Sequence, residues 1–303
     1  MRVASSQFHA TMNTALQEAT AKVAKVIQQM ATGQRMLYPS DDPIRSVRIS
    51  RLTREEAALR QYRDNIEALK SRLQQNEAAL EGMSADLMQV RDLLVWAADG
   101  GNTPDDLNAM AKALESLRDS LFYSANIKDQ EGRYMFSGTL TATPALAYDA
   151  TAAVGARYSF TGNTVEQRVM VGNGITQSAN VSLPEMATLL NMLDSAIDAL
   201  GTPGVNINDP AVRGKVTAAF DEVDVGLGAI SGKIATLGGA QTILQTLDDN
   251  HANVSLSNQQ ALITLGQLDY AEAAVKLDGY TSALEATQKA YGKVSGLSLF
   301  DVV

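Results

Sequence analysis

The chain has 303 residues, 45% of them hydrophobic, and a net charge of −9. This length accommodates one to three domains, and the apolar content is ample for a core. Cysteine is absent and there are only two histidines, at opposite ends of the sequence. These counts exclude a disulfide framework and a thiolate site, and they argue against a zinc site. We therefore expect no cofactor, no metal ligand and no catalytic residue.

Aromatic residues make up only 5% of the chain and there are seven prolines, a composition typical of extended helices. No run of 18 apolar residues occurs, so no membrane insertion is predicted. The first residues lack the apolar stretch of a cleavable signal peptide, which argues against conventional secretion.

The first predicted element is an amphipathic helix over residues 3–32, which contain no proline or glycine. Its apolar positions recur at intervals of four and three. Gly33 is a natural helix stop, and two prolines between residues 38 and 43 predict a turn. The members of this seam are Met12, Leu16, Ala19, Val23, Val26 and Met30.

Asp41 and Asp42 are adjacent carboxylates, which in a cleft could bind a cation or share a proton. The position before Pro43 favours another interpretation. An Asp before a proline that opens a helix accepts hydrogen bonds from free backbone N–H groups and complements the positive helix end. We expect capping.

A second helix is predicted to start at Pro43 and reach Ala97, about 80 Å at 1.5 Å per residue. Its heptad seam is interrupted by a single polar residue, Asn76, and such a narrow stripe can be buried only against other long helices. We call this stripe the rod seam. Its members are Leu59, Tyr62, Ile66, Leu69, Leu73, Leu80, Met83, Leu87, Val90 and Leu94.

Arginines crowd the start of this helix, which could indicate nucleic-acid binding. Acidic residues are interleaved, however, and the spacing predicts i, i+4 pairs Arg51/Glu55, Arg60/Asp64 and Arg63/Glu67. We therefore expect a solvated or subunit-facing flank and no nucleic acid.

After Gly100-Gly101, Thr103-Pro104 restarts a helix that returns antiparallel to the rod seam, with Trp96 packed near the turn. Residues 139–182 are rich in Thr, Val and Gly, with short alternations that predict β-strands. The stretches 156–160 and 167–171 are predicted to pair as a hairpin.

Helical patterns resume with a capping-box pattern at residues 182–185 and continue to the C-terminal region, with Gly266 as the one gap in the last seam. That seam again follows heptad spacing. Its members are Tyr270, Ala273, Leu277, Tyr280, Leu284, Thr287, Tyr291 and Val294.

The sequence predicts a mainly α protein: an elongated helical bundle and coiled coil formed by both chain termini, with a small inserted β-rich outer domain. Residues 1–43 and 262–303 are predicted to form the terminal coiled coil. Residues 44–138 and 183–261 would form a helical rod, and 139–182 the outer domain. A two-helix pair with small residues in its seam leaves apolar surface that a neighbouring copy could cover, so polymerisation is expected. No phosphate-binding loop, metal-ligand spacing or nucleophile elbow supports an enzyme.

Three motifs resemble the flagellin-like proteins of the bacterial flagellum, and among them the FlgL-type hook-filament junction proteins (hook-associated protein three). Residues 31–35 with 39–43 resemble the "SGKR...SDDP" segment after the first helix. Residues 133–138 are similar to the "YLFSG" motif that leads into the outer domain, and residues 296–301 to the "GLSLFD" ending. The resemblance implies a flagellin-like fold.

It also implies a structural adaptor that assembles with copies of itself between the hook-side junction protein and flagellin. Export through the flagellar type III pathway with a cytoplasmic chaperone, and a final location outside the cell, are further implications. A filament flagellin, or an unrelated coiled-coil scaffold or enzyme, remain the alternatives.

Overall fold

A computed structural model describes the backbone of residues 2–296 and the side chains of residues 6–293. The predicted seam residue Val294 and the motif at residues 296–301 lie outside the described side chains. The chain divides into two compact units. We call residues 1–58 with 252–303 the terminal unit, and residues 59–251 the rod unit.

The first two helices start and stop where the sequence predicts. Helix α1 spans Arg2–Thr32 and α2 spans Pro43–Ala97, with a short 3-10 turn at Pro39–Asp41 between them. Gly33 ends α1 with a φ of 68°, a left-handed conformation that glycine adopts without a steric penalty.

Helices α3 (Pro104–Ala125) and α4 (Glu185–Leu200) pack against each other within the rod unit. Thr103 caps α3, because its hydroxyl accepts a hydrogen bond from the backbone N–H of Asp106 while the Asp106 carboxylate accepts one from the backbone N–H of Thr103. This reciprocal capping box fixes the turn that reverses the chain after α2.

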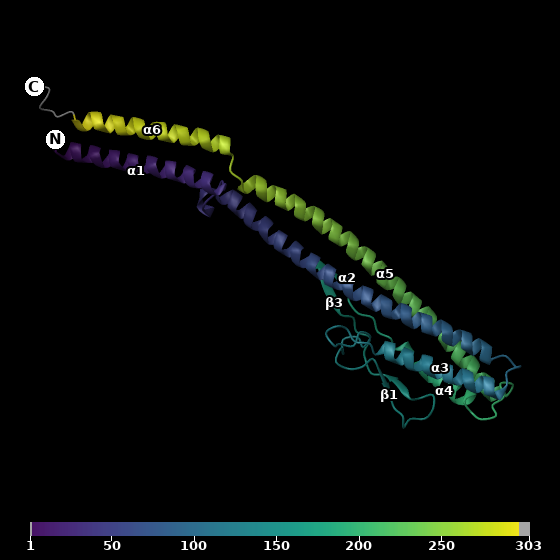
Figure 1. The fold of residues 1–303 in the computed structure, drawn as a ribbon. Helices are drawn as coiled ribbons and strands as arrows, with labels where there is room; N and C mark the ends of the chain where they lie inside the picture. The colour runs from purple at the N-terminus through teal and green to yellow at the C-terminus, as the bar shows by residue number, and fades with distance from the viewer. Residues whose placement is uncertain (1, 297–303) are drawn as a thin grey trace, which may run out of the picture. The chain divides into compact units, whose positions relative to one another are not determined.

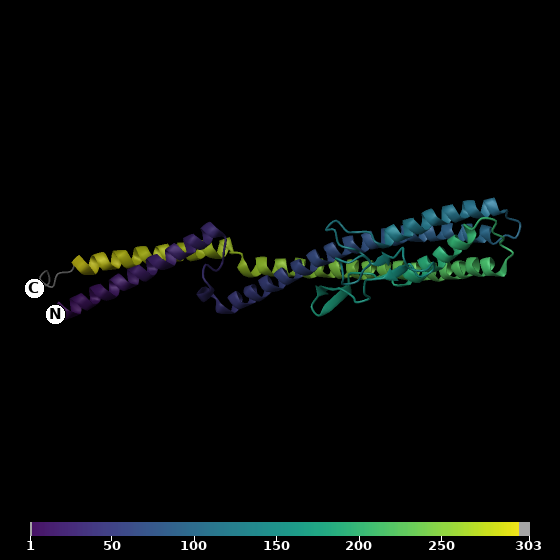
Figure 2. The ribbon, with the colours of Figure 1, turned by 90° about the horizontal axis from the view of Figure 1, so that it is seen from below.

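Helix α5 spans Pro210–Gly266 and α6 spans Tyr270–Gly296. The prediction of one continuous C-terminal seam across Gly266 was wrong, since the helix ends at this residue. Asp269 starts the next helix by accepting hydrogen bonds from the N–H groups of Ala271 and Glu272. Figures 1 and 2 both show α6 running beside α1, and α5 beside α2.

Four short strands form two separate antiparallel pairs. Strand β1 (Leu146–Tyr148) pairs with β2 (Tyr158–Phe160), and β3 (Arg168–Gly172) pairs with β4 (Ile175–Ser178). The predicted segment is therefore β-rich, and its strands are too few and too short to form a sheet with its own core.

The predicted hairpin between residues 156–160 and 167–171 is wrong. Both stretches contain a strand, but each pairs with a different neighbour. Gly174, with a φ of 72°, provides the tight turn between β3 and β4, and local turn geometry of this kind sets strand pairing. The Thr161-Gly162-Asn163 stretch instead lies against Ser137, since Asn163 donates its N–H to the Ser137 carbonyl.

One hydrophobic core fills the rod unit. It joins the inner faces of α2, α3, α4 and α5 to Phe136 and to apolar side chains of the inserted segment, among them Leu146 and Tyr158. Burial raises the pKa of the Tyr158 hydroxyl to about 12, so this side chain stays neutral in the core at physiological pH. The inserted segment thus shares its core with the helices. No helix within the described residues is long and apolar enough to cross a membrane.

Candidate assembly surface

Helices α1 and α6 pair within the terminal unit, and this pairing brings the two predicted terminal seams together. Among the described side chains of the pair, only Val26 and Ala273 are fully buried apolar residues. Tyr270 is exposed. The other described seam members are half-buried: Met12, Leu16, Ala19, Val23, Met30, Leu277, Tyr280, Leu284, Thr287 and Tyr291.

Two side-chain contacts connect the pair near its two ends. The Nδ1 atom of His9 lies 3.0 Å from the Tyr291 hydroxyl, with the rings edge to face. The Tyr270 hydroxyl donates to the Met30 carbonyl at 3.3 Å. Because Tyr270 is 51% exposed, its ring buries little apolar surface, and its hydroxyl hydrogen bond is its contribution to the α1–α6 pair.

The short connection between α5 and α6 is hydrogen-bonded to the residues at the end of α1. Leu268 donates its N–H to the Gly33 carbonyl, and Arg35 donates its N–H to the Gly266 carbonyl at 2.9 Å. Gln34 and Gln267 form an isolated antiparallel bridge. These backbone bonds fix the register of the two terminal segments, a feature that heptad spacing alone does not specify.

Asp41 and Asp42 both accept hydrogen bonds from backbone N–H groups, but only Asp42 caps α2 as predicted. Asp42 caps α2 by accepting the N–H of Arg45 at 3.0 Å. Asp41 accepts the N–H groups of Leu37 and Tyr38 and a bond from Lys25 Nζ. The Lys25 hydrogen bond and these backbone bonds hold the pKa of the Asp41 carboxyl below its usual value, against the opposing effect of burial.

An apolar pocket of about 750 Å³ adjoins this turn within the terminal unit. The connection after α1, the start of α2 and the end of α5 supply its walls. Its apolar lining includes Met36, Leu37, Pro39, Ile49, Leu262 and Ile263. Such an open apolar cavity is typical of a surface that another chain covers.

In the rod unit the rod seam faces the core. Tyr62 is half-buried, and all other members are buried: Leu59, Ile66, Leu69, Leu73, Leu80, Met83, Leu87, Val90 and Leu94. Asn76 is 1% exposed, and its Nδ2 has no hydrogen-bond partner among the described residues. Polar bonds flank the seam, such as those of Arg63 with Asp248 and Arg91 with Asp224.

Two of the three i, i+4 pairs predicted at the start of α2 are wrong. Within the described residues, neither Arg51 with Glu55 nor Arg60 with Asp64 forms an ion pair, and Arg63 pairs with Asp248 across to α5. Isolated i, i+4 pairs are worth only a few tenths of a kcal/mol, and the Arg63–Asp248 pair instead joins α2 to α5.

A network around Asp194 attaches the inserted segment to the helices. This carboxylate is 2% exposed, accepts a hydrogen bond from Arg118 at 3.0 Å and another from the N–H of Gly155, and lies 3.6 Å from Arg157. Nearby, the side chain of Asn191 bonds both the N–H and the carbonyl of Tyr158. No sequence pattern indicates this network, because its members are distant in the chain.

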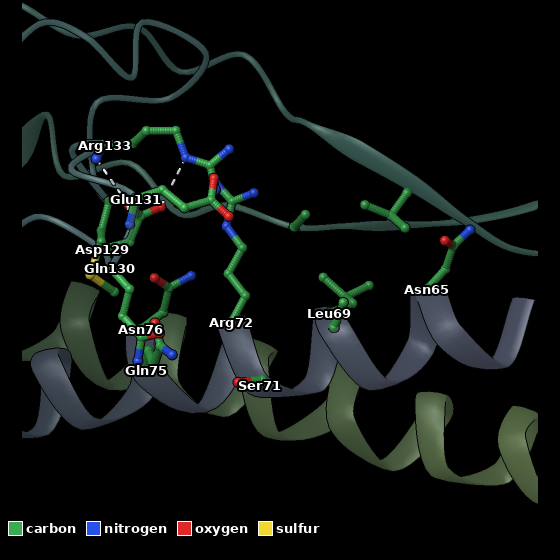
Figure 3. A pocket seen from close by; sticks show the side chains of 14 residues that line it. Asn65, Leu69, Ser71, Arg72, Gln75, Asn76, Asp129, Gln130, Glu131 and Arg133 are labelled. Carbon is green, nitrogen blue, oxygen red and sulfur yellow. Dashed lines mark hydrogen bonds and ion pairs between the residues drawn. The ribbon is translucent and has the colours of Figure 1, made fainter. Parts of the chain in front are cut away.

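Figure 3 shows a second cavity, of about 390 Å³, between α2 and the segment before the first strand. Arg72 points from α2 toward Glu131 and Arg133, and Arg133 is paired with Asp129 and Glu131. Burial and the nearby Arg133 charge lower the pKa of the Arg72 guanidinium. The charges in this cavity balance one another.

The predicted packing of Trp96 was wrong, since its side chain is 63% exposed. The tight turn after α2 leaves this position outside the rod seam, which passes through Leu94 and Ala97. No group of three His, Asp or Glu side chains suited to a metal ion occurs within the described part of the chain.

The chain is similar to flagellar proteins of known sequence and structure. Residues 3–141 match the bacterial flagellin N-terminal helical region. A structure from Vibrio parahaemolyticus, assigned as a flagellar hook-associated protein, is 31% identical with a TM-score of 0.66, and the match covers 74% of this chain and 99% of that one. The flagellar hook-associated protein 3 of Escherichia coli is 28% identical over 318 residues, covering 100% of this chain and 99% of that protein.

The chain belongs to the FlgL family of flagellar hook-associated proteins. The resemblance based on three sequence motifs is thereby confirmed, as is the mainly α, flagellin-like fold. A solved FlgL junction protein from Legionella pneumophila, 14% identical, has the same fold with a TM-score of 0.56 over 72% of this chain and all of that one. The family places this chain in the flagellum as a structural component.

Proposed function

We propose that this chain is a structural adaptor that polymerises at the hook-filament junction and connects the hook-side junction protein to the flagellin filament. It acts by assembly and performs no enzymatic reaction. The named functions of the FlgL relatives support this proposal, and so does the incomplete burial of the terminal unit.

That incomplete burial is the observation that carries the proposal. The α1 and α6 seams face each other, yet Val26 and Ala273 are the only fully buried apolar residues among the described side chains of the terminal unit. Two-helix pairs of this length gain most of their stability from tertiary burial. Neighbouring subunits that cover the half-buried seam would supply the missing burial.

We assign the parts of the chain accordingly. Residues 1–43 and 262–303 form the polymerisation domain, with the α1 and α6 seams as its assembly residues. Residues 44–138 and 183–261 form the rod, held by the rod seam, and residues 139–182 form the outer domain. The network around Asp194 supports a rigid attachment of the outer domain to the rod.

The proposal includes the route to this location. The chain would be exported through the flagellar type III pathway from a transient cytoplasmic pool, escorted by an export chaperone, and would end outside the cell. A marginal terminal unit is compatible with export, because a segment of low stability opens at little free-energy cost.

The test compares cells that lack this gene, with and without the restored chain. Immunogold labelling should place the chain in a short zone at the filament base, and filaments should be absent without it. Label along the whole filament would instead identify a flagellin.

A double substitution in α6 tests whether the half-buried terminal seam is needed for assembly. Leu277→Asp with Leu284→Asp places two charges in the half-buried seam, each costing several kcal/mol if left unpaired, and should abolish filament attachment. Val275→Asp is the matched control, because Val275 lies on the same helix and is 74% exposed. Normal attachment by the double variant would reject the assignment of the seam.

A further inference from the structure

The start of α2 presents a surface that is both cationic and apolar. Ile44 and Val47 are 84% and 69% exposed, and Arg48, Arg51 and Arg54 are exposed on the same side of the helix. We call these five residues the basic face. Exposed arginines beside uncovered apolar side chains match the composition of protein interfaces.

The arginines of the basic face have no acidic partner within the described residues. Among the residues that the structure describes, Arg48, Arg51 and Arg54 form no ion pair, and Arg54 donates to the backbone carbonyl of Ser50. Of the four arginines between residues 45 and 54, Arg45 pairs with Asp42, which leaves the three arginines of the basic face. The face therefore keeps a positive charge available to another molecule.

The complementary charge is present on the same chain. The rod unit, residues 59–251, holds 14 Lys and Arg against 24 Asp and Glu, a net charge of −10. Rod units packed side by side in a polymer would repel one another, since like charges destabilise a compact assembly. A basic face that lies against the acidic unit of a neighbour offsets this repulsion.

We propose that the basic face docks on the rod unit of a second copy of this chain. This contact deepens the proposed function and rests on it, because it specifies how copies meet in the assembly. The contact is heterologous: one surface of a copy binds a different surface of the next, which generates a ring or a helical array. Charge complementarity also fixes the register of the neighbours.

Charge reversal tests the docking face. Arg48→Glu with Arg51→Glu should reduce the number of filaments per cell about tenfold or more, because attraction becomes repulsion. Arg48→Lys with Arg51→Lys, which keeps the charge, should retain most filaments. Circular dichroism verifies that each variant is folded.

Photo-crosslinking identifies the molecule that binds the basic face. With p-benzoylphenylalanine in place of Val47, junctions isolated from cells should give a band at twice the 32.3 kDa of the chain, with crosslinked peptides from residues 59–251. A crosslink to a different protein, or to the terminal unit of the second copy, would overturn the proposal.

Different outcomes would overturn the docking contact and the junction role. Normal filaments with the reversed face would overturn the docking contact and leave the junction role intact. Absence of filaments with the unaltered restored chain would overturn the junction role itself.

Discussion

Leu268 donates its backbone N–H to the carbonyl oxygen of Gly33 at 3.0 Å, which joins the break between α5 and α6 to the end of α1. The two residues are 235 positions apart in the chain. The bond requires Gly33 to stay in the left-handed conformation, with a φ of 68°. This short backbone ladder sets the register in which the two terminal seams face each other.

Gly33→Ala should therefore destabilise the terminal unit by about 1 kcal/mol, because a Cβ disfavours a positive φ. The added Cβ would also lie 3.2 Å from the Tyr270 hydroxyl. Gly214→Ala is the control: this exposed glycine is in helix α5, has nothing within 4 Å of an added Cβ, and should gain stability by about 0.5–1 kcal/mol. Hydrogen exchange of α1 and α6 measures the first effect and denaturant unfolding the second. Unchanged exchange in Gly33→Ala would contradict the role of this residue.

The buried carboxylate of Asp194 leads to a prediction about the rod unit. Asp194→Asn removes the buried partner of Arg118 and Arg157, while Arg118 keeps its pairs with the exposed Glu115 and Asp119. Removing one member of a buried pair costs about 3–5 kcal/mol, and the remaining pairs should hold the loss at the lower end. Asp198→Asn serves as the control, since Asp198 is exposed and lies 3.9 Å from Lys215; its cost should be below about 1 kcal/mol. Equal denaturation midpoints for the two variants would argue against the network as an anchor.

The turn before α2 should loosen in acid. The pKa of Asp41 is lowered in the folded state, chiefly by its hydrogen bond with Lys25, so the ionised carboxylate contributes stability above its ordinary pKa of 3.8 and loses it as the pH falls through the lower folded value. At pH 7, Asp41→Asn should speed amide exchange at Leu37 and Tyr38, whose N–H groups Asp41 accepts. The gap between variant and parent should close as the pH falls below 3.8 and Asp41 becomes protonated in the folded state. A gap that does not narrow as the pH falls would show that ionisation is not involved.

Heptad spacing predicts the long helices well, because the stripe from Leu59 to Leu94 can be buried in only one way, against other helices. Strand pairing in the insert was not predictable, since short strands pair through turns and contacts that alternation does not encode. The position of Trp96 and the network of Asp194 with Arg118 also depend on contacts between distant segments. The break at Gly266 had a local signal, because Asp269 is a capping residue for the helix that follows.

Heptad spacing also predicts which residues belong to the α1 and α6 seams. It does not predict how much of these seams a single chain buries. Val23 and Leu284 lie at seam positions as regular as those of Leu80 and Leu87, yet the former pair is half-buried and the latter pair is 0% exposed. The difference arises from the number of surrounding helices: the rod seam lies in a core built from α2, α3, α4 and α5 with the insert, whereas α1 pairs with α6. A periodic pattern records that a face is apolar, and the tertiary arrangement decides what covers it.

The last prediction concerns the free monomer. The terminal unit has few fully buried apolar side chains and its helices are joined from opposite ends of the chain, so it should open at a free-energy cost well below that of global unfolding. In dilute monomer, residues 1 to about 40 and the last 35 or so should exchange amide hydrogens rapidly and be cleaved first by protease. The segment from Leu59 to Ala97 should be protected, because its seam faces the rod core.

In assembled junctions the same terminal residues should become protected, since neighbours then cover the seam and part of the association free energy orders the helices. The matched measurement is exchange of the parent chain as monomer and in isolated junctions under the same buffer. Equal protection of the terminal and rod helices in a verified monomer would show that the terminal pair is preformed and that assembly does not order it.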